Sequence, residues 1–219
     1  AAACTDLPRS AVRRHLLTLC HLGYMQTDGK LYWLAPRVLR LGRSYLSASR
    51  LHRQVQPFIQ RLSEIIGETV NVSVLDGHEV TYIARSSSPR LVSIGFQPGD
   101  RAPAHVVAPG VALVSSLTDQ AASLWLNEHE FVSFTARTVT TMGEFAKEVA
   151  SVRQNGFCKL DQQLNSGLTG VAVLLKDIRG RCHAAMGSSF PTVAWTSEEI
   201  TTRMLPALRA TAESLRPLL

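Results

Sequence analysis

Arginine and hydroxyl side chains recur at helical spacing in residues 7–19, "LPRSAVRRHLLTL". On a helix that turns about 100° per residue, Ser10, Arg13 and Arg14 fall on one side and Leu16 falls on the other. Guanidinium and hydroxyl groups bind phosphate oxygens and base edges in the grooves of DNA. The pattern therefore predicts an amphipathic helix whose polar face binds nucleic acid.

A tight hairpin is expected directly after this helix. Asp6 is a candidate N-cap, Gly23 suits a left-handed helix end, and Asp28-Gly29 favours a tight hairpin. A basic helix followed by a hairpin is the order of a winged helix-turn-helix, in which the helix enters the major groove and the wing follows the DNA backbone. The candidate DNA contacts are Arg9, Ser10, Arg13, Arg14, Thr18 and, at the tip of the wing, Lys30.

Charge separates the chain into two parts. The first 50 residues contain eight Lys and Arg and two Asp, a net charge of +6, whereas residues 51–219 contain 15 basic and 15 acidic residues. This excess of positive charge in the first 50 residues is consistent with either a polyanion-binding part or a solvated basic face. A helix-turn-helix also needs a helix before the recognition helix, so we expect 1–35 to be a partial DNA-binding domain and 36–50 a linker helix.

The composition indicates a folded protein without membrane spans. Hydrophobic residues make up 45% of the 219 residues, enough for a packed core, and no apolar run approaches the length of a membrane span. The first residues lack the pattern of a secretory signal. Cys4, Cys20, Cys158 and Cys182 are scattered, so we expect reduced thiols in a cytoplasmic protein and no metal site.

Residues 51–219 predict an α+β domain in which one mixed sheet carries packed helices. Helical patterns cover 51–66, 106–117 with a break near Pro109, 144–156, and 196–215 with a capping box of Thr196 and Glu199. Strand patterns cover 68–75, 78–85, 91–96, 157–161, 169–177 and 182–190.

Catalytic and cofactor motifs are absent from the sequence. There is no G-x-S-x-G, and "NSGLTG" at 165–170 does not match a dinucleotide-binding loop. His105 is either a ligand or base, or a satisfied polar residue. We therefore expect no enzyme activity and no cofactor. The alternatives are a small-molecule enzyme with a structural N-terminal segment, and a protein-interaction module that does not bind DNA even at low salt.

Three segments together resemble the IclR-type transcriptional regulators. Residues 7–46 resemble the recognition helix, wing and linker of that family, and "GDRAPAHVVAPGVALVSSL" resembles its G-x-R-x-P-x-H segment with the helix that follows. Residues 152–189 resemble its closing segment. The linker is most similar to the branch that controls protocatechuate and 4-hydroxybenzoate catabolism by the β-ketoadipate route.

The resemblance implies a winged-helix domain, a linker helix and a GAF-like effector domain over 51–219, in homodimers or homotetramers that bind operator DNA. It also implies a pocket for a small aromatic or short-chain carboxylate. Carried over by motif, Arg101 and His105 either hold the shape of this pocket or meet an anionic ligand. The remaining implied effector-binding residues are Ala108, Pro109, Leu160, Asp161, Leu168, Gly170, Gly187 and Ser189.

This sequence departs from the family pattern around the implied pocket. Pro109 and Val111 stand where the family commonly has a small residue and Lys, and Gly187 stands where it has Ser. Fewer polar groups should therefore line the pocket, which suits an aromatic ligand better than a very small keto acid. Ser189 and backbone N–H groups are then the expected polar anchors.

Overall fold

The computed structural model describes residues 2–86 and 95–219, including every side chain in these ranges except those of 46 and 47. The chain divides into two compact units, Ala1–Ser49 and Arg50–Leu219. The strand expected over 91–96 lies mostly outside the described residues. Among the described helices, none has both the length and the apolar character that a membrane crossing requires.

The first unit consists of a helix, a hairpin and a second helix, as predicted. Strands β1 and β2 pair antiparallel, and the last pair before the turn is Thr27 opposite Tyr32. Within the turn, the Asp28 carboxylate accepts hydrogen bonds from the N–H groups of Lys30 and Leu31 at 2.9 and 2.8 Å. The elements of this unit are η1 (Ala2–Cys4), α1 (Arg9–His21), β1 (Met25–Thr27), β2 (Tyr32–Leu34), η2 (Pro36–Val38) and α2 (Leu39–Ala48).

The two ends of α1 differ in how well the sequence predicts them. Gly23 has a φ of +76°, the left-handed conformation expected just after the helix. Asp6 is not the N-cap: α1 begins after Pro8, and no side chain caps its first turn. Pro8 fixes its own φ near the helical value, so the helix begins there without a capping carboxylate.

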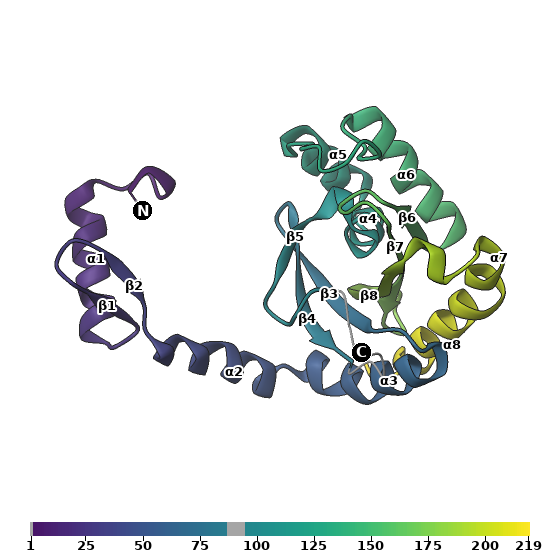
Figure 1. Ribbon diagram of the computed structural model, residues 1–219, viewed down its shortest axis with the longest axis horizontal. Helices are drawn as coiled ribbons and strands as arrows, with labels where there is room; N and C mark the ends of the chain where they lie inside the picture. The colour runs from purple at the N-terminus through teal and green to yellow at the C-terminus, as the bar shows by residue number, and fades with distance from the viewer. Residues whose placement is uncertain (1, 87–94) are drawn as a thin grey trace. The chain divides into compact units, whose positions relative to one another are not determined.

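The second unit is built on a six-stranded sheet in the order β5-β4-β3-β8-β7-β6, in which every described pairing is antiparallel. Its two longest strands, β7 and β8, pair with each other and are joined by a turn at 177–181 (Figure 1). The strands are β3 (Val70–Asp76), β4 (Glu79–Arg85), β5 (Arg101–Pro103), β6 (Cys158–Asp161), β7 (Leu168–Lys176) and β8 (Cys182–Pro191).

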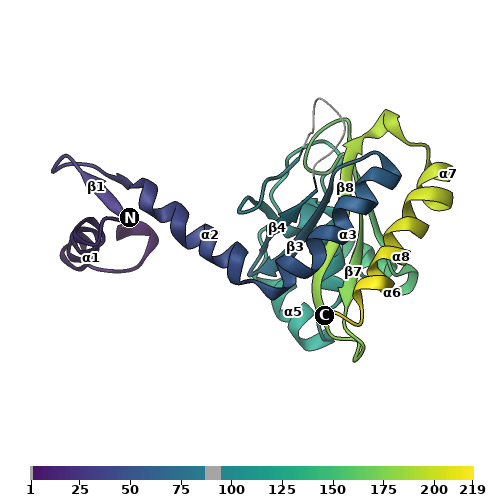
Figure 2. The same ribbon diagram turned by 90° about the horizontal axis from the view of Figure 1, so that it is seen from below.

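Helices cover both faces of this sheet. On one face α3 (Arg50–Ile66) and α8 (Leu205–Leu215) pack against each other, and α3 lies across β3 and β4 (Figure 2). On the other face α4 (Ala108–Ser115) packs against β7, β8 and β3, with α6 (Met142–Asn155) and α5 (Asp119–Glu128) outside it. Each face has its own apolar core, so the α+β layering expected from the sequence is present.

Pro109 begins a helix where the sequence predicted a break. A short turn, η3 (Ala104–Val106), precedes α4, and Pro109 occupies the first turn of α4, where no N–H is needed. A Cβ on Gly110 would lie 2.1 Å from the carbonyl oxygen of Ala104. The absence of a side chain at Gly110 is therefore what allows η3 to pack against α4.

The C-terminal helix has the predicted capping box but is not uniform. The Thr196 hydroxyl accepts a hydrogen bond from the Glu199 N–H, and the Glu199 carboxylate accepts one from the Thr196 N–H. A π-helical turn precedes Pro206, which cannot donate a backbone hydrogen bond. The segments are η4 (Thr192–Ala194), α7 (Ser197–Glu199), η5 (Ile200–Met204) and α8.

Candidate functional site

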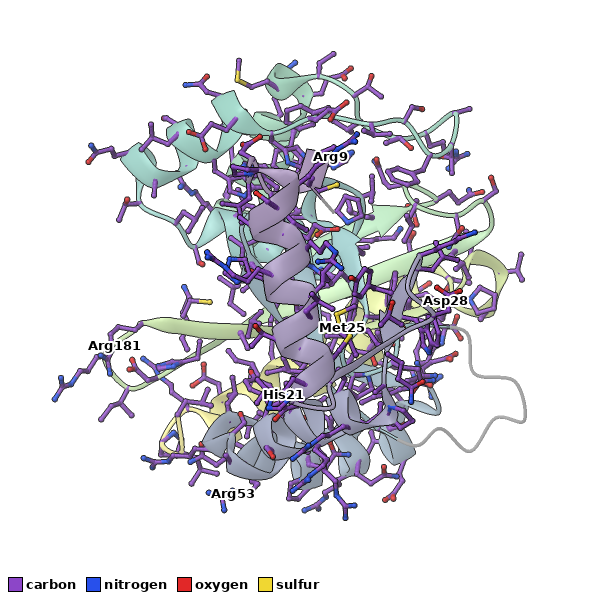
Figure 3. All side chains as sticks on the ribbon, turned by 90° about the vertical axis from the view of Figure 1, so that its left-hand side faces the viewer. Arg9, His21, Met25, Asp28, Arg53 and Arg181 are labelled. Carbon is purple, nitrogen blue, oxygen red and sulfur yellow. The ribbon has the colours of Figure 1, made fainter. Side chains whose placement is uncertain are left out.

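The polar face of α1 carries the predicted DNA contacts in exposed positions. Figure 3 shows α1 from Arg9 to His21, with Met25 and Asp28 of the hairpin beside it. Among the described residues, no hydrogen bond or ion pair engages the guanidinium groups of Arg9, Arg13 and Arg14. A shallow hollow on this face is lined by Ser10, Arg13, Arg14, Leu17, Thr18 and His21. These side chains are therefore available to a polyanion.

The opposite face of α1 is only partly covered by its own unit. Val12 is buried, whereas Leu19 and Leu22 are 38% and 47% exposed. Arg37, which is also basic, has a structural role: it donates to the Leu22 carbonyl at 2.7 Å and lies over the Tyr24 ring. Arg37 thus supports the C-terminal end of α1 and is not part of its exposed polar face.

Lys30 lies at the exposed tip of the hairpin, whose turn is held by local hydrogen bonds. The Thr27 hydroxyl donates to the Leu31 carbonyl at 2.7 Å and accepts from the Gly29 N–H at 3.0 Å. The N–H groups of Leu31 and Lys30, which donate to the Asp28 carboxylate, lower the pKa of that group. The turn therefore presents Lys30 on an ordered support.

The second unit contains a cavity of about 260 Å³ at the N-terminal end of α4. Three segments far apart in the sequence form its walls: the end of the β4–β5 connection, η3 with the start of α4, and the β6–β7 region with β8. Its lining residues are Gly95, Phe96, Val106, Val107, Ala108, Leu160, Leu164, Asn165, Leu168, Thr169, Gly170 and Ser189. The lining is mainly apolar, with a few polar groups.

The polar groups of this cavity differ in how far they are already engaged. The Thr169 hydroxyl donates to the Asp161 carboxylate at 2.7 Å and also contacts the Thr192 hydroxyl. The Ser189 hydroxyl has no hydrogen-bond partner among the described residues. The first turn of α4 begins at Ala108, so the positive end of that helix dipole lies at the same wall. An anionic group would therefore meet the Ser189 hydroxyl next to the positive end of the α4 dipole, where the Gly110 N–H is already engaged by the Val107 carbonyl.

Five of the ten predicted effector-binding residues line this cavity: Ala108, Leu160, Leu168, Gly170 and Ser189. The sequence did not single out Phe96, Leu164 or Asn165, which come from connecting segments. Phe96 stacks on Tyr82 with ring centroids 4.3 Å apart, which places its ring at the wall. Only the fold brings these connections to the motif residues.

The other five predicted residues do not line the cavity. Arg101 is half-exposed and pairs with Asp76 and Glu79, both at 3.0 Å, at the β5 edge of the sheet. The Asp161 carboxylate pairs with Lys159 at 3.2 Å in addition to accepting from Thr169.

Pro109 and Gly187 are buried at packing contacts. Pro109 lies in the first turn of α4. A Cβ on Gly187 would lie 2.4 Å from the Val171 carbonyl oxygen. Only glycine therefore fits at this position of β8 without moving the neighbouring strand β7. His105 is buried, and its ring nitrogens contact the carbonyl oxygen of Val132 and the ring of His129.

A second cavity, of about 420 Å³, lies between α4, α6, β7 and α8 and contains several cations. Its two arginines already have protein partners: Arg153 donates to the Ser115 and Leu117 carbonyls and pairs with Asp119, and Arg209 donates to the Asn155 carbonyl. These bonds satisfy the C-terminal carbonyls of two helices. Helix capping thus accounts for Arg153 and Arg209 in this second cavity.

The cysteines are poorly suited to nucleophilic chemistry. All four are free, and burial raises the pKa of Cys158 and of Cys182. Both groups therefore remain thiols at neutral pH, and the thiolate is the reactive form. Among the described residues, no group of three or more His, Cys, Asp or Glu side chains is arranged to hold a metal ion.

Comparison with known proteins gives consistent matches. Residues 43–216 match the family described as bacterial transcriptional regulator IclR C-terminal. The chain is 36% identical to the Pca regulon regulatory protein of Pseudomonas putida over 96% of this chain and 73% of that protein. It is 34% identical to the p-hydroxybenzoate hydroxylase transcriptional activator of Acinetobacter baylyi, over 98% of this chain and 81% of that protein.

A solved structure extends the match to the cavity-bearing unit. The PobR inducer binding domain from Acinetobacter, a double mutant in complex with 3-hydroxybenzoic acid, is 30% identical to this chain with a TM-score of 0.72. The alignment covers 76% of this chain and 98% of that domain.

Proposed function

The chain belongs to the IclR family of bacterial transcriptional regulators, and we propose that it controls aromatic-acid catabolism by binding operator DNA and an aromatic carboxylate. It is a regulator rather than an enzyme, as its relatives are. The proposed domains are the partial DNA-binding domain at 1–35, the linker helix at 36–50 and the effector domain at 51–219.

The observation that carries the effector assignment is the mainly apolar cavity at the start of α4. A dry cavity of about 150 Å³ suffices for benzene, and this one measures about 260 Å³. We assign the aromatic ring to the wall of Leu160, Leu168 and Gly170, and the carboxylate to Ser189 and the N-terminus of α4 at Ala108. The bound 3-hydroxybenzoic acid of the PobR domain supports this ligand class.

The remaining predicted residues are assigned to the support of the cavity. Arg101 and Asp161 hold strand ends through ion pairs, and Pro109 and Gly187 permit close packing. His105 fixes the segment that follows α5. None of these five is proposed to contact the effector.

The DNA contacts are assigned to the exposed face of α1 and the tip of the wing. In the major groove, guanidinium groups are the commonest partners of guanine, and lysine at a wing meets phosphate. We propose that homodimers or homotetramers place two such helices on half-sites about 34–36 Å apart, in the cytoplasm. The proposed contacts are Arg9, Ser10, Arg13, Arg14, Thr18 and Lys30.

A thermal-shift screen of aromatic and short-chain carboxylic acids tests the proposed function. A ligand at 100 times its dissociation constant stabilises the folded state by about 2.7 kcal/mol. We expect 3-hydroxybenzoate or 4-hydroxybenzoate to raise the melting temperature and acetate not to do so. A response to the short-chain acids alone would contradict the aromatic assignment.

A further inference from the structure

Three histidines from separate elements form a hydrogen-bonded chain beside the effector cavity. His78 lies in the β3–β4 turn, His129 directly follows α5, and His105 lies in η3. The Nδ1 atoms of His78 and His129 are 3.2 Å apart, and Nε2 of His129 is 2.7 Å from Nδ1 of His105. The chain ends at the Val132 carbonyl oxygen, 3.0 Å from Nε2 of His105.

The carbonyl at the end of this chain fixes the direction of every bond in the neutral state. A carbonyl only accepts, so Nε2 of His105 carries a proton and its Nδ1 accepts. Nε2–H of His129 must then donate to His105, which leaves Nδ1 of His129 as the acceptor for Nδ1–H of His78. The geometry therefore assigns one tautomer to each of the three rings.

This chain holds a segment that connects two walls of the cavity. Val132 belongs to residues 129–141, which join α5 to α6. Further along the same segment, the Thr135 hydroxyl donates to the Gln162 carbonyl at 2.6 Å, and the Val139 N–H donates to the Gln163 side chain at 2.7 Å. His105 adjoins the cavity wall at 106–108, and Gln163 adjoins the wall at 164–165. The segment 129–141 thus ties these two walls together.

An added proton has different effects along the chain. A proton on Nε2 of His78, 3.9 Å from the Glu128 carboxylate, leaves all three bonds intact. A proton on Nδ1 of His129 or Nδ1 of His105 places two N–H groups against each other. The titratable groups that face His129 are His78 and His105, with Glu128 beyond His78. The other neighbours are the rings of Trp125, Phe131 and Phe145.

While the segment 129–141 is closed, the His129 and His105 rings resist protonation. Burial, together with the nearby rings of His105 and His78, lowers the pKa of His129 to about 4, and burial also lowers the pKa of His105. A histidine released to solvent has a pKa of about 6.5. Between pH 6.5 and pH 4 the open segment therefore binds more protons than the closed one, so opening becomes more favourable as the pH falls.

We propose that His78, His129 and His105 form a proton-sensitive latch on the effector cavity, closed when all three rings are neutral and released when a proton enters at His129 or His105. An effector that binds only the closed cavity would keep the segment 129–141 in place. This second part rests on the proposed function, whereas the latch itself does not.

Hydrogen exchange of the whole chain tests the latch without any ligand. Between pH 6.5 and pH 4.5, protection of 129–141, corrected for the intrinsic exchange rate, should fall about tenfold per pH unit for each histidine released. Peptides from β7 and β8 should show no such slope. Constant protection of 129–141 across this range would overturn the proposal.

The variant His129→Gln keeps the hydrogen bonds of this side chain but removes its titration. Its amide can donate to His105 and accept from His78 but does not titrate in this range. We expect the protection of 129–141 in this variant to be near the wild-type value at pH 7. As the pH falls, that protection should decrease less steeply than in the wild type, by about tenfold per pH unit. His15→Gln, on α1, should keep the wild-type slope. A wild-type slope in His129→Gln would refute the assigned role of this ring.

A ligand arm distinguishes failure of the latch from failure of the proposed effector. At 100 times its dissociation constant, 3-hydroxybenzoate should raise protection of 129–141 about 100-fold at pH 7. Binding without added protection would show that the effector does not hold the segment in place and would overturn this second part of the proposal. An absence of 3-hydroxybenzoate binding, with the pH slope intact, would refute the effector class and leave the latch supported.

Discussion

The two units carry their binding residues in opposite environments. In Ala1–Ser49 the proposed contacts are exposed cations and hydroxyls on α1 and at the hairpin tip, and this unit carries a net charge of +5 out of the chain's +6. In Arg50–Leu219 the proposed contacts line a mainly apolar cavity, and the residues after 50 carry no net charge. A surface site is thus defined by side-chain chemistry, whereas an internal site is defined by close backbone packing around it.

The largest difference should appear when the same small side chain is added in each unit. Gly110→Ala places a Cβ against the Ala104 backbone, whereas a Cβ on Gly42, in α2, meets nothing within 4 Å. We expect Gly110→Ala to lower the free energy of unfolding by about 3 kcal/mol. Gly42→Ala should instead stabilise its helix by about 0.5–1 kcal/mol. Chemical denaturation measures both, and equal effects would remove the packing argument.

Loss of one guanidinium on α1 should weaken DNA binding without changing stability. If Arg13 reads a guanine, Arg13→Ala lowers operator affinity by about 1–3 kcal/mol. Arg179→Ala, an exposed position in the second unit, is the matched control and should leave affinity unchanged. Gel-shift titrations at fixed salt measure the effect. Unchanged binding by Arg13→Ala and Arg14→Ala would remove α1 as the recognition helix.

Removal of the free hydroxyl in the cavity should have a smaller effect. Ser189→Ala deletes one proposed hydrogen bond to the carboxylate, which should weaken 3-hydroxybenzoate binding about fivefold. Ser151→Ala, on the exposed side of α6, is the control. Calorimetric titration measures both affinities. A fivefold loss in the control variant, or none in Ser189→Ala, would contradict the assigned anchor.

The smallest expected effect concerns the wing. Because Lys30 is proposed to meet phosphate, Lys30→Ala should weaken specific and non-specific DNA binding alike and reduce the salt dependence by about one counterion. The slope of the binding constant against salt concentration measures this change. A loss confined to one DNA sequence would instead indicate a base contact at this position.

The sequence predicted best those elements that local chemistry determines. The hairpin follows from Asp28-Gly29, and the α1 face follows from residue type and helical spacing. Helix α5 was not predicted, because it buries only Ala122 and Trp125, too few positions to establish a periodicity. The three-residue strand β5 is likewise too short to show alternation.

The sequence predicted only some of the residues that line the cavity. Motif resemblance located Gly170 and Ser189, but Phe96 and Leu164 lie in connections whose positions depend on tertiary packing. The histidine chain had no sequence pattern at all: its hydrogen-bonded pairs are 51 and 24 residues apart. Such long-range contacts follow from the sheet order rather than from any local spacing.

Calorimetric titration of 3-hydroxybenzoate into the wild-type chain and into Gly170→Val tests whether the cavity at the start of α4 binds the effector. A Cβ at Gly170 would lie 3.3 Å from the Cβ of Ala108 and 3.7 Å from the Ser189 hydroxyl oxygen, so valine should fill the space between the proposed ring wall and the carboxylate anchor. We expect saturable binding to the wild type and at least about tenfold weaker binding to the variant. Equal affinities in two folded proteins would show that the effector binds elsewhere and would contradict the account.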